Sequence, residues 1–324
     1  MIRFDRLKLL TKNYYIKRID ECKLKTLYDT MDLIEVKKYR QKSPFFLSFD
    51  KIYQKEPKLI IEFSAKILYD NYIDLINKNN IRQCFENINK LKIIELDIDR
   101  VLNDCEVLSC EITKDFNAQM FDIKDYVILN MKDNTNWTVK TPQYKNNIII
   151  QNELTSNPKR ITFYEKDKEL KMASNEKFFN LLKDRKNKVI DYFDRNNIRA
   201  ELKVVSKKQI RNMLKIENTQ LSAVLNSDVN PIYDLLCETV KPISELDRCQ
   251  FEEPQTIKEL ERLAVIEKFQ CDMKLVEQYI RGMLKKNKST VSFKRTIKPY
   301  HYIYERIVKN NVPRIDLHKL LGAA

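Results

Sequence analysis

A tyrosine, a lysine and a glutamate lie within six residues of one another in the segment RITFYEKDKEL at 160–170. Apolar and polar residues alternate at its start, and this spacing predicts a strand with Tyr164 and Lys166 on the same face. An ammonium group beside a phenol favours the phenolate, which is the form that attacks phosphorus. The segment therefore predicts phosphoryl-transfer chemistry with Tyr164 as nucleophile and Lys166 beside it. A second interpretation stays open, in which both side chains only line the solvated face of a strand.

Four carboxylates lie on the polar faces of predicted strands or immediately beyond one: Glu62, Glu111, Glu169 and Glu201. The strands concerned are predicted at 58–64, 108–115, 160–166 and 198–205. Carboxylates that converge on one sheet face repel each other, so a divalent cation or a lysine has to accompany them. We therefore expect these glutamates to hold Mg²⁺ or Mn²⁺, which oxygen ligands suit, near a scissile phosphate. Taken singly, each glutamate also fits an exposed strand position.

Histidine and glycine are scarce, and their scarcity argues against several classes of site. Only His301 and His318 occur, without zinc-motif spacing, which argues against a histidine-ligated zinc and a Ser-His-Asp triad. Gly282 and Gly322 are the only glycines, which excludes the glycine-rich phosphate loops of ATPases and dinucleotide-binding proteins. The seven cysteines form no C-x-x-C pair, so we expect reduced and mostly packed thiols.

The charge balance favours a polyanionic partner. Sixty Lys and Arg residues against 46 Asp and Glu give a formal net charge of +14, and nucleic acid is the leading candidate, although the same balance can simply confer solubility. A basic stretch at 285–298, followed by tyrosines, is expected to contact DNA through Lys285, Lys286, Lys288, Lys294, Arg295 and Lys298. A solvated basic face is an equally open interpretation of this stretch.

The patterns together predict an α+β fold in two domains. Residues 1–205 are expected to form a mainly antiparallel sheet domain, and residues 206–324 a mostly helical, basic domain with a DNA-binding or accessory role. Capping boxes that begin at Ser206 and Thr256 mark helix starts. Further expected elements are an edge strand within 1–20, helices at 72–91 and 175–193, a hairpin of 146–151 and 160–166 around a turn at 155–158, and a long helix from 256 to 284. With no apolar run of 18 residues and charged first residues, we expect a soluble, cytosolic protein without membrane contact.

In series, four segments resemble motifs of rolling-circle replication initiators, namely the gene II proteins of filamentous phages and related plasmid initiators. In that family a segment with serine, lysine and leucine precedes G-H-N, then a strand R-x-D-x-T or R-x-D-x-C follows, and Y-x-K-x-x-E-L and R-x-E come last. The corresponding segments here are SAKILYDN at 64–71, SCEIT at 109–113, YEKDKEL at 164–170 and RAE at 199–201. The resemblance covers about residues 58–225, and YEKDKEL is its most specific part.

The resemblance implies a nicking domain of the kind found in Rep proteins and relaxases, with Tyr164 as the nucleophile, Lys166 and Glu169 as its neighbours and Glu111 as the acidic strand residue. On the same comparison, DNA contacts are expected from Lys66, Asn71 and Arg199. The implied reaction nicks one strand of origin DNA with Mg²⁺ or Mn²⁺ and without ATP. It leaves a 5′-phosphotyrosine and a 3′-hydroxyl that a host polymerase extends, and a host helicase is a further expected partner. The expected location is the cytoplasm of a bacterial host cell.

The chain departs from the family at two places, since Tyr69-Asp70 replace the glycine and histidine before Asn71, and Ser109 replaces the strand arginine. An acid or amide would therefore have to serve where the family uses an imidazole. Two other functions stay open: a non-enzymatic, winged-helix initiator that only binds a plasmid origin, and a relaxase or transposase with the same tyrosine chemistry. Tyr300 and Tyr304, spaced about one helical turn apart, are alternative nucleophiles.

Overall fold

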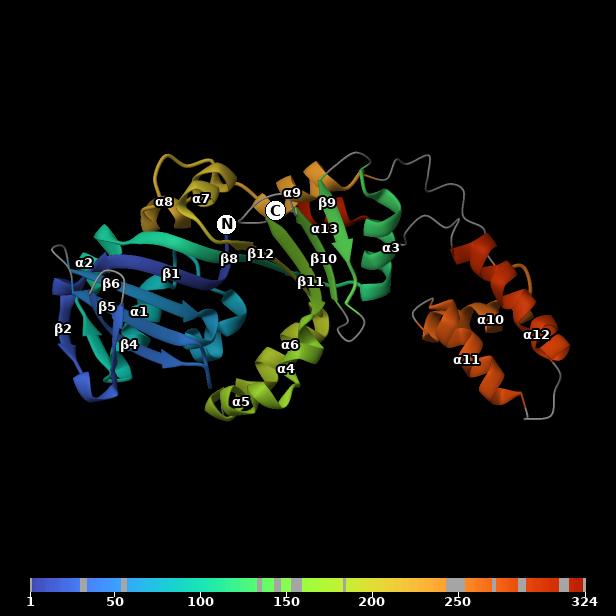
Figure 1. The fold of residues 1–324 in the computed structure, drawn as a ribbon, viewed down its shortest axis with the longest axis horizontal. Helices are drawn as coiled ribbons and strands as arrows, with labels where there is room; N and C mark the ends of the chain where they lie inside the picture. The colour runs from blue at the N-terminus through green and yellow to red at the C-terminus, as the bar shows by residue number, and fades with distance from the viewer. Residues whose placement is uncertain are drawn as a thin grey trace. The chain divides into compact units, whose positions relative to one another are not determined.

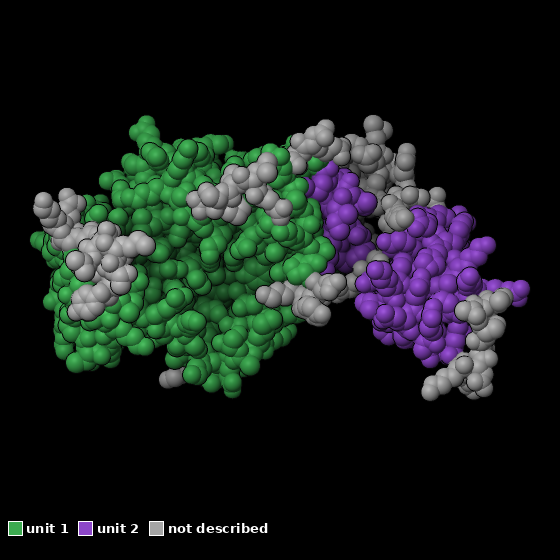
Figure 2. Space-filling model, in the orientation of Figure 1, with its two compact units in different colours: residues 1–120, 132–240, 317–324 green, residues 121–131, 241–316 purple. Residues whose placement is uncertain are grey.

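The structure is a computed structural model in which two compact units are found (Figure 2). Unit 1 comprises residues 1–120, 132–240 and 317–324, and unit 2 comprises residues 121–131 and 241–316. The residues that the structure describes are 2–29, 34–53, 57–132, 136–142, 147–152, 159–182, 185–242, 254–269, 272–284, 290–308 and 315–322.

Unit 1 is built on a large sheet with ten strands in the described part of the chain. These strands are β1 (Phe4–Lys12), β3 (Lys25–Asp29), β4 (Ile34–Gln41), β5 (Leu47–Tyr53), β6 (Lys58–Ser64), β8 (Glu106–Phe116), β9 (Trp137–Lys140), β10 (Asn147–Asn152), β11 (Arg160–Glu165) and β12 (Ile198–Val204). Their order is β3-β4-β5-β6-β1-β8-β12-β11-β10-β9, and every pairing is antiparallel (Figure 1). A separate two-stranded sheet consists of β2 (Ile16–Ile19) and β7 (Ile94–Leu96).

The predicted α+β class is confirmed at this level, because a large antiparallel sheet is combined with many helices. Strands β6, β8 and β12 lie where the alternating patterns predicted them, and β10 pairs with β11 as the expected hairpin. The predicted turn at 155–158 lies outside the described residues. Among the helices that the structure describes, none combines the length and the apolar character that a membrane crossing requires.

Strand β1 lies in the middle of the large sheet, between β6 and β8, so the prediction of an edge strand within 1–20 is wrong for this sheet, and only the short β2 lies at an edge, in the separate two-stranded sheet. Leu7 and Leu9 are fully buried, whereas Arg6 and Lys8 at the alternate positions are only half-buried. Charges at alternate positions are typical of edge strands. Here they mark instead the polar face of a central strand.

The two faces of the sheet differ in chemistry. Leu7 is paired with Phe63 of β6 on one side and with Cys110 of β8 on the other, so these apolar residues share a face. Helix α1 (Ile81–Lys90) packs on this face, with the Phe85 ring 5.7 Å from the Phe63 ring. The opposite face carries the polar residues of the same strands, because successive strand residues point to opposite sides.

The other helical elements of unit 1 are η1 (Asn13–Tyr15), η2 (Glu21–Lys23), η3 (Ala65–Asp74), α2 (Ile98–Asp104), α4 (Lys166–Leu170), η4 (Ala173–Asn175), α5 (Glu176–Leu182), α6 (Lys186–Arg195), α7 (Lys207–Leu214), α8 (Leu221–Leu225), α9 (Pro231–Thr239) and α13 (Leu317–Gly322). Lys166, expected to end a strand, begins α4. The helix expected at 175–193 is divided between α5 and α6.

The helix expected at 72–91 is also interrupted, since η3 ends at Asp74 and α1 begins at Ile81. Asparagine side chains bond to the backbone of the intervening turn. The Asn77 backbone amide donates to Asn80 Oδ1 at 2.8 Å, and Asn80 Nδ2 donates to the Leu75 carbonyl oxygen at 2.6 Å. Such local bonds compete with the helical ladder, which explains why the predicted continuous helix is wrong.

Unit 2 contains α10 (Ile257–Lys268), α11 (Met273–Met283), α12 (Thr290–Ile303), the π-helical turn η7 (Tyr304–Val308) and, from Phe121 onward, α3 (Met120–Asn130). The Thr256 side chain caps α10 as predicted, at 3.2 Å from the Glu259 amide nitrogen. The single long helix expected from 256 to 284 is two helices, because the Asp272 carboxylate accepts from the amides of Lys274 and Leu275 and starts α11. The predicted stripe with Val276 and Ile280 is buried in the core of this unit.

The compact units divide the chain at other positions than the predicted domains 1–205 and 206–324. Residues 206–240 belong to unit 1, where α7 and α8 contact β8 and α9 contacts β8 and β12. The predicted cap at Ser206 is present, since its hydroxyl accepts from the Gln209 amide at 3.3 Å. The change from strand to helix at Ser206 therefore marks a change of secondary structure inside one compact unit.

Lys215 ends α7 in the left-handed region, with φ 53° and ψ 45°. A side chain is strained there and glycine is not, so we expect Lys215→Gly to raise the free energy of unfolding by about 0.5–1 kcal/mol. The exposed ion pair that Lys215 forms with Asp234 contributes little. Urea unfolding measures the change, and Lys215→Ala is the control that removes the ion pair without relieving the strain. Equal stability of the two variants would contradict this explanation.

Candidate active site

Strand register brings the predicted nucleophile beside a predicted metal ligand. Tyr164 of β11 is paired with Arg199 of β12, and Thr162 is paired with Glu201 on the same face. Tyr164 and Glu201 are thus diagonal neighbours across two strands. The Tyr164 hydroxyl donates a hydrogen bond to Glu201 Oε2 at 3.2 Å, and the tyrosine is half-buried. The alternation of polar and apolar residues predicted which face of the strand Tyr164 occupies. The pairing of β11 with β12 places its hydrogen-bond partner, Glu201, on the same face.

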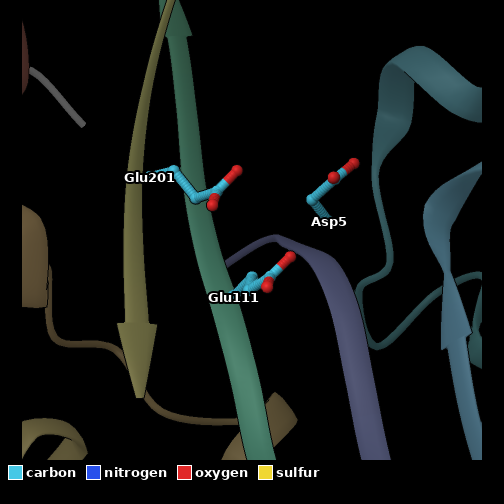
Figure 3. A group of neighbouring side chains, drawn as sticks. All are labelled: Asp5, Glu111 and Glu201. Carbon is cyan, nitrogen blue, oxygen red and sulfur yellow. The ribbon is translucent and has the colours of Figure 1, made fainter. Parts of the chain in front are cut away.

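Three carboxylates converge on the sheet (Figure 3), and one of them is the Glu201 that accepts from Tyr164. Asp5 of β1, Glu111 of β8 and Glu201 of β12 each offer one oxygen, and the three oxygens lie within 4.8 Å of one another. The three strands are neighbours in the sheet, so three distant parts of the chain supply the group. Asp5 lies at a register shift of β1 between Phe4 and Arg6.

Two of the four expected metal ligands belong to this group, namely Glu111 and Glu201. The other two form ion pairs outside it: Glu62 lies 3.5 Å from Arg6, and Glu169 lies 2.6 Å from Lys166. Sequence reasoning missed Asp5, which stands in the segment expected to form an edge strand. Once β1 is known to be central, an acidic residue at its start next to two glutamate-bearing strands is the signal that would have found it.

Burial and mutual repulsion determine the protonation of the carboxylates. Burial, followed by the charges of Glu111 and Asp5, raises the pKa of Glu201 to about 7. Burial also raises the pKa of Glu111, although Arg6 and Lys203 oppose the shift. For Asp5, burial acts in the same direction, but Arg199 and the other nearby cations lower its pKa below the usual value. Burial and like charges therefore disfavour ionisation of Glu111 and Glu201, whereas the nearby cations favour the ionised form of Asp5.

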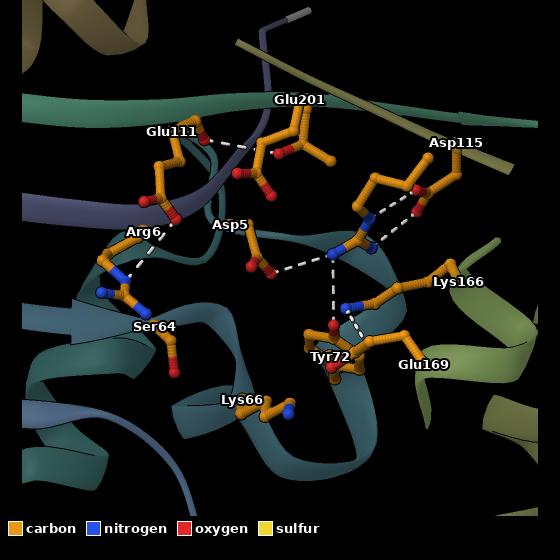
Figure 4. Close-up of polar contacts among 12 residues, drawn as sticks. Asp5, Arg6, Ser64, Lys66, Tyr72, Glu111, Asp115, Lys166, Glu169 and Glu201 are labelled. Atoms are coloured by element: carbon orange, nitrogen blue, oxygen red, sulfur yellow. Dashed lines mark hydrogen bonds and ion pairs between the residues drawn. The ribbon is translucent and has the colours of Figure 1, made fainter. Parts of the chain in front are cut away.

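Arg199 supports the site from inside the protein, and its partners Asp5, Asp115 and Tyr72 are labelled in Figure 4. Its side chain is fully buried, and its guanidinium forms a bidentate pair with Asp115, at 2.7 and 2.9 Å. It also donates to Asp5 at 3.0 Å and to the Tyr72 hydroxyl at 3.2 Å. Because it is enclosed, Arg199 has no surface with which to contact DNA, contrary to expectation. It positions Asp5 and compensates part of its charge.

Two lysines, Lys166 and Lys66, lie near Asp5 (Figure 4), and the Lys166 ammonium also lies 5.6 Å from the centre of the Tyr164 ring. Burial opposes the charge of Lys166, but Tyr164, Tyr72 and Glu169 raise its pKa well above the usual value, so the ammonium is charged at neutral pH. Lys66 donates to Asn175 Oδ1 at 2.5 Å, and burial, followed by the charge of Lys166, lowers its pKa. The site thus combines a group of carboxylates with cations beside it.

The predicted action of Lys166 on the tyrosine is outweighed in the structure. Burial raises the pKa of Tyr164 well above its ordinary value, Lys166 lowers it in part, and Glu201 raises it further. The lysine alone therefore does not give the phenolate, contrary to the sequence-based expectation. The hydrogen bond to Glu201 provides a direct acceptor for the phenol proton.

The donor set of the carboxylate group fits a hard divalent cation. All three donors are carboxylate oxygens close enough to share one ion, and a bound cation would offset the burial and repulsion that disfavour ionisation of Glu111 and Glu201. Asp5, Glu111 and Glu201 would hold Mg²⁺ or Mn²⁺ there. Histidine plays no part in this set, in line with its scarcity in the sequence.

The raised pKa of Glu201 predicts that the effect of metal binding on protein stability depends on pH. A carboxyl whose folded pKa is raised, as for Glu201, makes the metal-free protein less stable as pH rises from about 4.5 to about 7. Below about pH 7 a metal ion has to displace the proton from Glu201, whereas above about pH 7 this carboxylate is already ionised. We therefore expect Mn²⁺ to raise the melting temperature more at about pH 8 than at about pH 6. Differential scanning fluorimetry measures both shifts; Glu201→Gln should abolish the difference, and equal shifts in the wild-type protein would contradict it.

The remaining predicted residues lie elsewhere. Asn71 of η3 is half-buried, and its Nδ2 donates to Gln83 Oε1 at 3.4 Å. Lys294, Arg295 and Lys298 are exposed on α12 of unit 2, and Lys285, Lys286 and Lys288 lie outside the described residues. The alternative nucleophiles Tyr300 and Tyr304 pack against the apolar core of unit 2. Five cysteines fall in the described part of the chain, and all five are free thiols.

Comparison with known proteins adds no further assignment. The chain matches no family model, no curated protein sequence and no solved structure. The residues of the candidate site and their geometry are therefore the basis for inferring the function.

Proposed function

We propose that this protein is a replication initiator that nicks one strand of origin DNA by tyrosine transesterification, as rolling-circle initiators do. One observation carries the proposal. The hydroxyl of Tyr164, the tyrosine of the YEKDKEL segment, donates to Glu201, a member of the only group of three metal-competent side chains found among the described residues. This contact places a hydroxyl nucleophile beside a proton acceptor, as the proposed reaction requires.

The chain's residues suit an in-line attack on a phosphodiester. Tyr164 transfers its proton to Glu201 as its oxygen forms the new bond to phosphorus. The bond from phosphorus to the 3′ oxygen breaks, and that oxygen leaves with the electron pair and takes a proton from water. The products are a 5′-phosphotyrosine and a free 3′-hydroxyl. One phosphodiester is exchanged for another, so the step needs no ATP.

Charges beside the tyrosine favour this step. The Lys166 ammonium lies 5.6 Å from the centre of the Tyr164 ring and stabilises negative charge near the reacting oxygen. Lys66 is a half-buried cation on this side and can face a phosphate oxygen once its bond to Asn175 is exchanged. A divalent cation at Asp5, Glu111 and Glu201 supplies Lewis-acid polarisation of the phosphate when bound.

The order of the motif residues supports the family resemblance. The segments around Glu111, Tyr164 and Glu201 were matched to the family separately, and these three residues lie on the adjacent strands β8, β11 and β12. Tyr69, which stands where the family has a glycine, has φ 52°. This left-handed region favours glycine, so the backbone at that position agrees with the family pattern. Asp5 is the acidic donor that takes the place of the missing histidine in this proposal.

We further propose that the partners are origin DNA, a host polymerase that extends the 3′-hydroxyl, and a host helicase. The proposed location is the cytoplasm of a bacterial host. The exposed cations Lys294, Arg295 and Lys298 on α12 support a DNA contact by unit 2. Relaxases and transposases share the tyrosine chemistry, so the identity of the nicked DNA separates them from an initiator.

A trapped adduct tests the proposal directly. The protein is incubated with Mn²⁺ and supercoiled DNA that carries its origin, and the covalent complex is digested with a protease and a nuclease. We expect a peptide that contains Tyr164 with a nucleotide phosphate on its ring oxygen, together with metal-dependent conversion of supercoiled to open circular DNA. An adduct on another tyrosine, or origin binding without any nicking, would refute this assignment.

A further inference from the structure

A hollow of about 560 Å³ lies on the polar face of the sheet beside Glu111. Its floor comes from β1, β6, β8 and β12, and the start of α7 forms part of its wall. The cations in its lining are Arg6, Lys8, Lys203 and Lys207, against the carboxylates Glu62 and Glu111. It therefore adjoins the candidate metal group and presents net positive charge.

Arg6, Glu111 and Lys203 form one row across three strands. Register pairs Arg6 of β1 with Glu111 of β8, and Glu111 with Lys203 of β12. Arg6 Nε lies 3.6 Å from Glu111 Oε2, and Lys203 Nζ lies 3.5 Å from Glu111 Oε1. These ion pairs are loose, and the buried Arg6 Nε makes no hydrogen bond. Arg6 also lies 3.5 Å from Glu62, so its guanidinium is held only by loose ion pairs and has hydrogen-bonding capacity left for an anionic ligand.

An aromatic ring extends this surface. The guanidinium carbon of Arg6 lies 4.3 Å from the centre of the Phe46 ring, and that of Arg40 lies 5.4 Å from the same ring. Phe46 is half-buried and Arg40 is exposed, so both are accessible from the polar face. Cations that follow a groove, combined with an aromatic side chain for base stacking, are the features by which proteins bind single-stranded nucleic acid.

On the basis of the proposed nicking function, we propose that this groove binds the backbone of single-stranded DNA next to the scissile bond. When a divalent cation binds Glu111, Arg6 and Lys203 exchange their ion pairs with Glu111 for contacts with DNA phosphates. In this arrangement the same carboxylate is shared in turn by the protein's cations and the metal. Metal binding and DNA binding then reinforce each other, because each removes a competitor of the other.

The exchange predicts effects of opposite sign from one substitution. Arg6→Gln and Lys203→Gln remove cations that compete with the metal for Glu111, so we expect either variant to bind Mn²⁺ alone about fivefold more tightly. The same variants lose a phosphate contact and are expected to bind a fluorescein-labelled oligothymidylate of about 20 nucleotides about fivefold more weakly in the presence of Mn²⁺. A merely structural role for either residue would weaken both interactions.

Isothermal titration with Mn²⁺ and fluorescence anisotropy with the oligonucleotide measure the two affinities on the full chain. Lys17→Gln is the matched control, since Lys17 lies on β2 and also forms a loose pair, with Asp97 at 4.0 Å; it should change neither affinity. Because the variants differ in position, a folding defect in Arg6→Gln, recognised by its melting temperature, leaves Lys203→Gln as the test. Metal and DNA affinity that fall together in Lys203→Gln, or DNA affinity that stays unchanged, would overturn the proposal.

A duplex of the same sequence composition separates the two forms of DNA. We expect Arg6→Gln and Lys203→Gln to weaken the single-strand complex more than the duplex complex, and equal losses would overturn the assignment to a single strand. Binding is measured without a nicking step, so the result is separable from the proposed activity. If the protein binds DNA as expected but never forms a Tyr164 adduct, the proposed groove is supported and the proposed nicking function is refuted.

Discussion

Tyr164→Phe is expected to abolish nicking, with a loss of at least about 1,000-fold in rate, and to eliminate the covalent adduct. The phenyl ring has no oxygen to form the bond to phosphorus, while it occupies the same space between β11 and β12. The substitution removes one hydrogen bond to Glu201, so the free energy of unfolding should change by no more than about 1 kcal/mol. Supercoiled-DNA conversion measures the rate, and urea unfolding measures the stability.

Tyr300→Phe is the matched control for this experiment, because Tyr300 is an alternative nucleophile from sequence but packs against the core of unit 2. It should nick at the wild-type rate. If Tyr164→Phe nicks normally and Tyr300→Phe does not, the chemistry belongs to unit 2 and the proposed site is wrong. If both variants are inactive but fold and bind DNA, neither substitution identifies the nucleophile and the adduct has to be mapped.

The strands that carry the candidate site were predictable because local alternation determines which face a side chain occupies. Glu111 and Glu201 lie on polar strand faces of half-buried strands, and period-2 spacing places them there without any knowledge of the fold. The YEKDKEL segment likewise fixes the face of Tyr164. What alternation does not give is which strands are neighbours, since that depends on contacts between residues far apart in the chain.

The contributions of Asp5 and Arg199 were missed for this reason. Asp5 becomes a candidate ligand only when β1 is known to lie between β6 and β8. Arg199 follows the polar pattern of an exposed strand residue, and a charged residue at such a position is usually at the surface. Its burial results from Asp115 on β8 and Tyr72 on η3, two partners that no pattern within β12 reveals.

The predicted helix boundaries were wrong for a different reason, which lies in local side-chain bonds to the backbone. The turn with Asn77 and Asn80 and the cap at Asp272 each end or begin a helix through side-chain bonds to the backbone. Asparagine and aspartate are known for this behaviour, and the apolar periodicity that continued across both positions concealed it. A search for capping residues inside long periodic segments would have divided these helices correctly.

The internal charge network makes Arg199 the position where a single substitution should cost most stability. Its guanidinium is fully buried against Asp115, whose side chain is 1% exposed, and it also serves Asp5 and Tyr72. Arg199→Ala leaves the Asp115 carboxylate buried without its partner, which typically destabilises a protein by about 3–5 kcal/mol. Arg199→Lys should recover only part of this loss, because an ammonium cannot replace the bidentate geometry.

Urea unfolding of Arg199→Ala, with Arg195→Ala as control, tests this prediction. Arg195 is exposed at the end of α6, so its loss should change the free energy of unfolding by less than about 0.5 kcal/mol. Adding Asp115→Asn to Arg199→Ala should restore part of the stability, since it removes the unpaired charge. A loss below about 1 kcal/mol for Arg199→Ala would mean that water or another cation reaches Asp115. In that case Asp115 and Arg199 would not form the enclosed pair on which the expected loss of stability depends.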